Sequence, residues 1–89
     1  MYDYANIRTI RLDQIGQRIR IAGSEGLAQA GVFTEGTVVA VDEEKQTFRV
    51  VIDTAILGND QNGPFRVDYD RSEYPRQNLA LADVLAWGI

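Results

Sequence analysis

Two β-branched runs on either side of a short polar turn constrain the fold of this chain more than any other feature. The runs cover residues 36–42 and 47–53, and Glu43-Glu44-Lys45-Gln46 lies between them. Valine, isoleucine, threonine and phenylalanine favour strands, and two such runs around a polar turn are typical of an antiparallel hairpin. We expect the alternating residues Phe48, Val50 and Ile52 to face a core. The stretch 37–41 is apolar at nearly every position, which predicts a central strand covered on both faces.

Two further stretches alternate between apolar and charged residues with the period of a half-buried strand. Residues 17–22 place two isoleucines opposite two arginines, and residues 65–70 place Phe65, Val67 and Tyr69 opposite charged residues. Residues 7–12 are predicted to form a short edge strand. Residues 27–35 are predicted to form a loop whose Val32 and Phe33 fold back over the core.

Toward the end of the chain, turn and helix signals dominate. Residues 58–63 contain no apolar side chain, which predicts a flexible loop. Asn78 is a good helix N-cap and strong helix formers follow it, so a short helix is predicted there, with a strand over residues 82–87 as the alternative. The pattern predicts an all-β, mainly antiparallel fold: one domain over residues 1–89, as a small SH3-like barrel of about five strands with one short C-terminal helix. A partly open sheet with one packed helix is the second possibility.

The amino-acid composition excludes most kinds of catalytic chemistry. The 89 residues include no cysteine and no histidine, so a disulfide scaffold, a thiolate metal site and the commonest general base are all absent. Asp68, Asp70 and Glu73 could together hold a hard cation, but Arg66 and Arg71 lie among them, and ion pairing on a solvated strand face is the expected outcome. We expect a protein that is not an enzyme and binds no cofactor or metal ion.

Charge is unevenly distributed along the chain. The net charge is −4, and the first 24 residues carry four arginines against two acids, whereas the remainder carries five basic residues against eleven acids. An acidic chain lacks the basic face that generic nucleic-acid binding needs. No apolar run is long enough to span a membrane and no secretory signal is evident, so the chain is expected to be cytoplasmic, without a membrane partner.

The acidic residues suggest a protein-interaction module with an acidic binding face for a partner with a basic surface. A more specific hypothesis is an inhibitor from a mobile element that mimics nucleic-acid charge. The predicted partner-binding residues are Asp42, Glu43, Glu44, Asp68, Asp70, Glu73 and Tyr74. The alternative is a small-barrel nucleic-acid-binding protein that uses an N-terminal arginine patch of Arg8, Arg11, Arg18 and Arg20.

Overall fold

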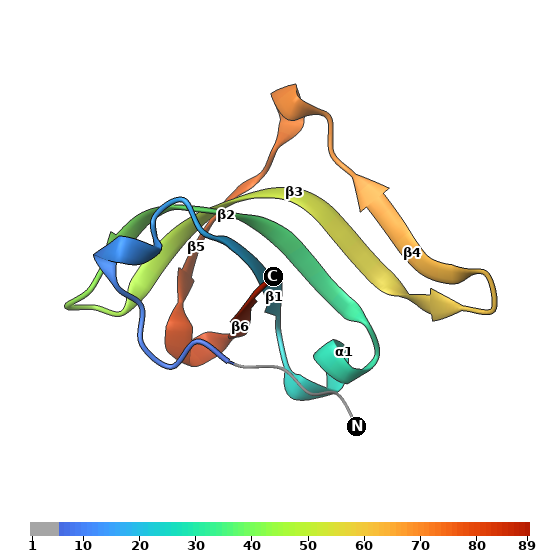
Figure 1. The fold of residues 1–89 in the computed structure, drawn as a ribbon, viewed down its shortest axis with the longest axis horizontal. Coiled ribbons are helices and arrows are strands. Elements are labelled where there is room, and N and C mark those ends of the chain that lie inside the picture. Colours follow the sequence, from blue (N-terminus) through green and yellow to red (C-terminus); the bar gives the residue numbers. More distant parts are fainter. Residues whose placement is uncertain (1–5) are drawn as a thin grey trace.

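An antiparallel sheet forms most of the molecule in a computed structural model that describes residues 6–89 (Figure 1). Within residues 6–89, helical structure is limited to one short α-helix, α1 (Glu25–Gln29), and three single turns, η1 (Leu12–Gln14), η2 (Arg71–Glu73) and η3 (Leu81–Asp83). The described residues contain six strands, which are β1 (Arg18–Ala22), β2 (Val32–Asp42), β3 (Thr47–Asp60), β4 (Gly63–Asp68), β5 (Arg76–Ala80) and β6 (Leu85–Gly88). The all-β, antiparallel class is confirmed.

The strands are ordered β4-β3-β2-β1-β6, and β5 also pairs with β3. Strand β3 is long enough to serve two neighbours along one edge: its first half pairs with β5 and its second half pairs with β4. In the described part of the chain, β6 at one end of this order pairs with neither β4 nor β5. The sheet is therefore not closed.

The predicted hairpin is present as β2 and β3. Its register runs from Asp42↔Thr47 at the turn, and Phe48, Val50 and Ile52 are buried as predicted. The coverage predicted for residues 37–41 is wrong on one face. A bulge between Val38 and Ala40 interrupts the pairing, and the Val39 side chain is exposed while Val38 is fully buried. Because the bulge re-aims side chains, this strand has one solvated face.

The predicted edge strand over residues 7–12 is not formed. Ile7 N–H donates to the Ala86 carbonyl and Ile10 is fully buried, but no strand follows. Instead, the Gln46 side chain binds both main-chain groups of Ile10: Oε1 accepts from its N–H at 2.8 Å and Nε2 donates to its carbonyl at 3.1 Å. One amide side chain thus takes the hydrogen bonds that a neighbouring strand would otherwise supply.

The two predicted loops are largely regular structure. In residues 27–35, α1 is capped by Ser24, whose Oγ accepts from Leu27 N–H, and β2 already begins at Val32. In residues 58–63, β3 runs on to Asp60, and Gly63 begins β4 after a two-residue turn. Ladder hydrogen bonds involve the backbone, so polar side chains did not prevent this strand from continuing.

The predicted C-terminal helix is wrong, and the alternative strand lies closer to the outcome. Residues 76–80 form β5 along β3, where Asn78 accepts from Arg49 Nε at 2.8 Å. After η3, β6 pairs with β1 and places Ala86 opposite Ile21. Tertiary pairing overrides the intrinsic helix preference of this segment.

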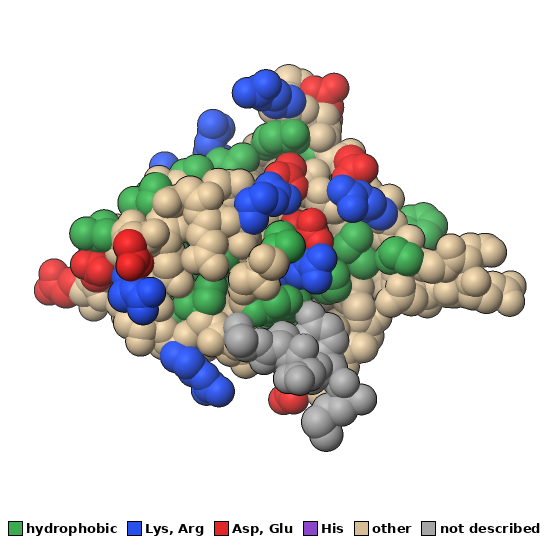
Figure 2. All heavy atoms as spheres, viewed as in Figure 1, with side chains coloured by type: hydrophobic (Ala, Val, Ile, Leu, Met, Phe, Trp, Pro, Cys, Tyr) green, Lys and Arg blue, Asp and Glu red, His purple; other side chains and the backbone are tan. Residues whose placement is uncertain are grey.

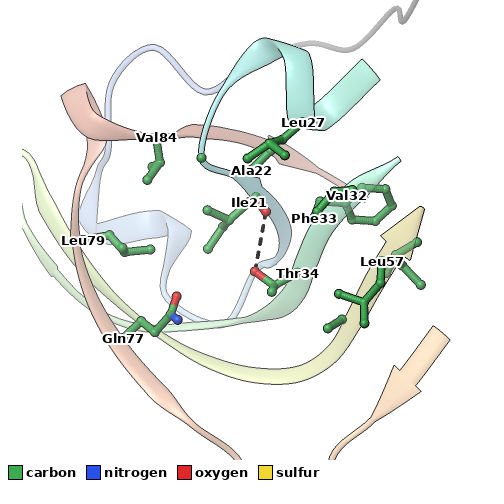
Figure 3. A pocket seen from close by; sticks show the side chains of 13 residues that line it. Ile21, Ala22, Leu27, Val32, Phe33, Thr34, Leu57, Gln77, Leu79 and Val84 are labelled. Atoms are coloured by element: carbon green, nitrogen blue, oxygen red, sulfur yellow. Dashed lines mark hydrogen bonds between the residues drawn. The ribbon is translucent and has the colours of Figure 1, made fainter. Parts of the chain in front are cut away.

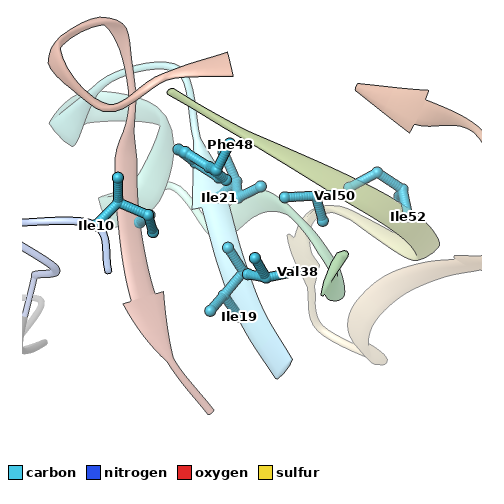
Figure 4. Packing of buried hydrophobic residues seen from close by; sticks show 8 residues of the cluster. Ile10, Ile19, Ile21, Val38, Phe48, Val50 and Ile52 are labelled. Atoms are coloured by element: carbon cyan, nitrogen blue, oxygen red, sulfur yellow. The ribbon is translucent and has the colours of Figure 1, made fainter. Parts of the chain in front are cut away.

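Two apolar clusters stabilise the sheet. The smaller cluster packs α1 on the outer face through Ala22, Ala28 and Trp87, with the Phe33 ring edge-on to Trp87 at 5.7 Å between ring centroids. The larger cluster lies inside the curved sheet and draws on β1, β2, β3, β6 and the segment before η1 (Figure 4). Its buried members are Ile10, Ile19, Ile21, Val38, Phe48, Val50, Ile52 and Ala86.

Candidate partner-binding groove

The inner face of the sheet continues beyond the larger core and forms a groove, called here the apolar groove. Pairing places Thr34 between Ile21 on β1 and Ala55 on β3, so these three residues share the inner face. The cavity measures about 270 Å³. Figure 3 shows β5 on one side of it, with Gln77 and Leu79, and Val32 and Leu57 on the other side.

A tight backbone junction places α1 at one end of this groove. Gly31, between α1 and β2, has a φ of +76°, and its carbonyl accepts a hydrogen bond from Gly58 N–H at 3.1 Å. A side chain at Gly31 would also meet the Asn59 amide. Only glycine adopts this conformation without strain, and the junction brings Leu27 over the groove.

The groove is chemically simple. Thr34 and Gln77 are the polar side chains among its lining residues, and none of the lining side chains is titratable. The Thr34 hydroxyl already donates to the Ile21 carbonyl. Pockets for whole small molecules span ~300–1,000 Å³, so this groove suits one or two apolar side chains of a larger ligand. It offers no group for acid–base chemistry.

Exposed apolar side chains extend from the groove onto β4. Leu57 in the groove is 55% exposed, and on β4 Phe65 is 61% exposed and Val67 is 37% exposed. Val67 pairs with Ala55, a groove residue, and Phe65 lies two positions along the same strand face. Contiguous exposed apolar residues on a small protein mark interaction surfaces.

The acidic residues predicted to bind a partner fall into two separate groups. Asp42, Glu43 and Glu44, the acidic tip, lie at the turn of the β2–β3 hairpin, at the left of Figures 1 and 2. There Asp42 accepts from Lys45 N–H and Glu43 Oε2 accepts from Leu12 N–H. The hairpin tip and η2 project from different ends of the molecule, so the single face predicted from sequence is not assembled.

The second group, the η2 corner, comprises Asp68, Asp70, Glu73 and Tyr74. Asp68 Oδ1 accepts from Arg66 Nε at 2.9 Å and from Thr54 Oγ1 at 3.2 Å. Asp70 caps η2 by accepting from the N–H and hydroxyl of Ser72, and these bonds lower its pKa. Glu73 is exposed and Tyr74 is half-buried. Within residues 6–89 no three carboxylates gather as a metal site requires.

Three of the four arginines in the predicted patch form ion pairs with acidic residues. Arg11 pairs with Asp13 at 3.1 Å, Arg20 pairs with Glu35 at 2.9 Å, and Arg18 pairs with Asp53 at 2.7 Å. On the face of the molecule seen in Figure 2, basic and acidic side chains lie close to one another. Arg8 is exposed and makes no ion pair with any described residue.

Sequence reasoning did not identify Glu35 and Asp53 as the ion-pair partners of these arginines. Glu35 is 8% exposed and lies between Arg20 and the second nitrogen of Arg18, at 2.9 and 3.9 Å. The alternating patterns of β2 and β3 can be read from the sequence, but the sequence does not say which strands lie beside them. The groove was missed for the same reason, although the Val32-Phe33 pair was a usable signal.

Comparison of the chain with family models, with curated proteins and with solved structures found no match. No helix in the described part of the chain is long and apolar enough to cross a membrane. Because the comparisons found no match, the function of the apolar groove is inferred from its geometry.

Proposed function

We propose that this protein is a non-enzymatic protein-interaction module whose apolar groove binds an apolar segment of a partner with a basic surface. The observation that carries the proposal is the groove itself. It is lined by side chains without titratable groups, and it leaves Leu27 and Leu57 about half exposed, at 44% and 55%. Fully burying an exposed leucine contributes ~1.5–3 kcal/mol, and covering the exposed half of each leucine contributes about half of that. The two anchors therefore support a weak, reversible contact that the other groove residues must strengthen.

The charged residues near the apolar groove favour a partner with a basic surface. Five acids lie within three residues of groove-lining positions in the sequence, and Glu35 and Asp53 among them are paired with arginines. The other three are Glu25, Asp60 and Asp83. None of the three forms an ion pair with a described residue. With a net charge of −4, they favour a segment whose apolar anchors are flanked by lysine or arginine.

The acidic tip and the η2 corner take a supporting part in this proposal. Because they lie apart, they act on the approach of a basic partner through the long-range field, which raises the association rate and weakens with salt. Mimicry of a nucleic-acid backbone, in an inhibitor from a mobile element, is the more specific version. It requires both groups to contact one partner.

We also propose that the open sheet is a variant of a small SH3-like barrel. Two features support this. The last strand, β6, pairs with the first strand, β1, as closure of a small barrel requires. In addition, β5 pairs with the first half of β3, which gives the five-strand order β5-β3-β2-β1-β6 of a barrel that stays open between β5 and β6.

A peptide selection tests the function. Short random peptides would be selected on the immobilised protein, and a selected peptide titrated into ¹⁵N-labelled protein. We expect paired apolar residues flanked by basic ones, with amide shifts at groove residues such as Val32 and Leu79. Leu57→Lys should weaken binding ~10-fold or more. Leu12→Lys is the matched control, since Leu12 is equally exposed, at 57%, and lies outside the groove.

The same titrations contain the outcomes that oppose the proposal. Selection of peptides without apolar residues, or shifts confined to residues 42–46, would assign binding to the acidic tip. Micromolar binding of DNA or RNA with a steep loss at higher salt would favour the arginine patch instead. A folded protein that selects no peptide would overturn the proposal.

A further inference from the structure

Strand β4 has one free edge. It pairs with β3 alone, and no other described strand lies along its second edge. Tyr69 N–H donates to the Asp53 carbonyl at 2.9 Å, in the same register as the Ala55↔Val67 pair. In an antiparallel ladder, hydrogen-bonded positions alternate. The main-chain groups of Val67 therefore point toward β3, and those of Arg66 and Asp68 point outward at the free edge.

The side chains on this edge are self-complementary. Arg66 and Asp68 lie two positions apart on one strand face and form an ion pair at 2.9 Å within one copy, with side chains 56% and 63% exposed. This exposed pair can be exchanged for pairs between two copies. If a second β4 pairs antiparallel about Val67, then Arg66 of each copy lies opposite Asp68 of the other. The outward main-chain groups of these two residues match in the same register. Charges normally protect an edge from pairing, but this arrangement attracts an identical edge.

The apolar residues agree with that register. Val67 of the two copies would meet at the centre, and Phe65 of each would lie opposite Tyr69 of the other. Phe65, at 61% exposed, and Val67, at 37% exposed, would lose contact with water. Pro64 has no N–H to donate, so pairing is confined to the residues that follow it.

We infer that two copies of this chain associate by antiparallel pairing of their β4 edges, with the two-fold axis at Val67. Such an interface uses the same residues from both copies and closes as a dimer. Four main-chain hydrogen bonds and two cross-strand ion pairs follow from the register. The interface and the apolar groove share no lining residue, although Val67 on β4 pairs with the groove residue Ala55.

Charge exchange tests the register. Sedimentation of the full chain, up to millimolar concentration, should show a species of twice 9.9 kDa. Asp68→Arg alone and Arg66→Asp alone each place like charges opposite each other, and each should raise the dissociation constant at least tenfold. An equimolar mixture of the two variants restores both opposite-charge pairs and should dimerise again. Arg8→Asp, a matched change away from β4, should leave the dimer intact.

Each remaining outcome decides against the inference. A wild-type chain that stays monomeric at millimolar concentration overturns it, as does a dimer that both single variants retain. A mixture that fails to associate, when circular dichroism shows both variants folded, overturns the register. If either variant does not fold, Phe65→Lys replaces it as the test. This substitution at an exposed position should dissociate the dimer. Retention of the dimer by Phe65→Lys overturns the inference. Leu57→Lys separates the two proposals, since it should abolish peptide binding and leave the dimer unchanged.

Discussion

Arg18 holds the carboxylate of Asp53 with two hydrogen bonds, from Nη1 to Oδ2 at 2.7 Å and from Nη2 to Oδ1 at 3.1 Å. The two residues lie on β1 and β3, and β2 runs between them. Asp53 is the extra residue of a bulge, because Glu35 pairs with Thr54 and Gly36 pairs with Ile52. The bulge turns Asp53 toward Arg18, so the pair ties three strands together where β3 changes neighbour.

The ion pair predicts a specific loss of stability in acid. The hydrogen bond from Arg18 lowers the pKa of Asp53 below its ordinary value of 3.8. Because the folded state favours the ionised form, the contribution is complete above pH 3.8 and disappears as pH falls through the lowered pKa. The pair is partly exposed, so we expect about 1 kcal/mol or less. Urea unfolding between pH 2 and 6 measures it.

Asp53→Asn should remove this part of the acid dependence and reduce stability at neutral pH. Its free energy of unfolding should approach that of the wild type as the pH falls. If the wild type and Asp53→Asn differ by the same amount at every pH, the ion pair does not stabilise the fold through the charge of Asp53.

Truncation of the hairpin core should be costly. Phe48→Ala and Val50→Ala each remove side-chain atoms from the larger cluster, where both residues are buried, and should reduce stability by ~1.5–4 kcal/mol. Arg49 between them is exposed, and its hydrogen bond to Asn78 lies at the surface, so Arg49→Ala should change stability by no more than ~0.5 kcal/mol. Chemical denaturation of the three variants ranks them. An Arg49→Ala variant less stable than the other two would contradict the strand register.

Two glycines should respond oppositely to alanine. At Gly36 an added methyl group would overlap the Val51 carbonyl and lie 2.8 Å from Val50 Cγ1. Gly36→Ala should therefore cost about 2 kcal/mol or more, because β2 and β3 must separate. At Gly26, in α1, the methyl group would meet Ser24 Oγ at 3.9 Å, an ordinary contact. Gly26→Ala should be neutral or stabilise by up to ~1 kcal/mol. Equal melting temperatures for the two variants would contradict this.

Gln46 should control the order of the segment before η1. Gln46→Ala removes both hydrogen bonds to Ile10 and should cost ~1–2 kcal/mol. Gln46 has a φ of +54°, and alanine bears the same backbone strain, so the change isolates the side chain. Amide exchange at Ile10 should accelerate in this variant. Gln29→Ala, which loses a surface bond to Glu25, is the control and should leave Ile10 protected.

The sequence predicts elements whose side chains repeat with a clear period. Strands β1 and β3 are confirmed, and their alternate apolar residues are buried as expected. Residues 65–68 alternate as clearly and form the predicted strand, but both faces of it are exposed, so the predicted half-buried strand is wrong in its burial. The segments 7–12, 58–63 and 78–87 were wrongly assigned, and each for a physical reason. Side-chain hydrogen bonds replaced a strand in the first, backbone pairing tolerated polar side chains in the second, and neighbouring strands overrode helix preference in the third.

The candidate site was less predictable than the fold. Apolar groove residues such as Ile21, Leu57 and Leu79 meet only through the order of the strands, which local patterns do not contain. The same holds for Arg18 and Asp53, which are 35 positions apart. The predicted acidic residues are exposed as expected, but their separation into two groups depends on where the hairpin ends.

The pairing of β1 with β6 has a consequence for the order of folding. The β2–β3 hairpin closes over a four-residue turn, so its loop entropy is small and it can form early. Strand β1 can pair with β6 only after residues 85–88 have left the ribosome, and until then one edge of β1 stays open. Ala86 reaches its place opposite Ile21 only then. Until residues 85–88 emerge, the nascent chain carries a strand with one open edge, and in that interval it is most exposed to aggregation and to chaperones.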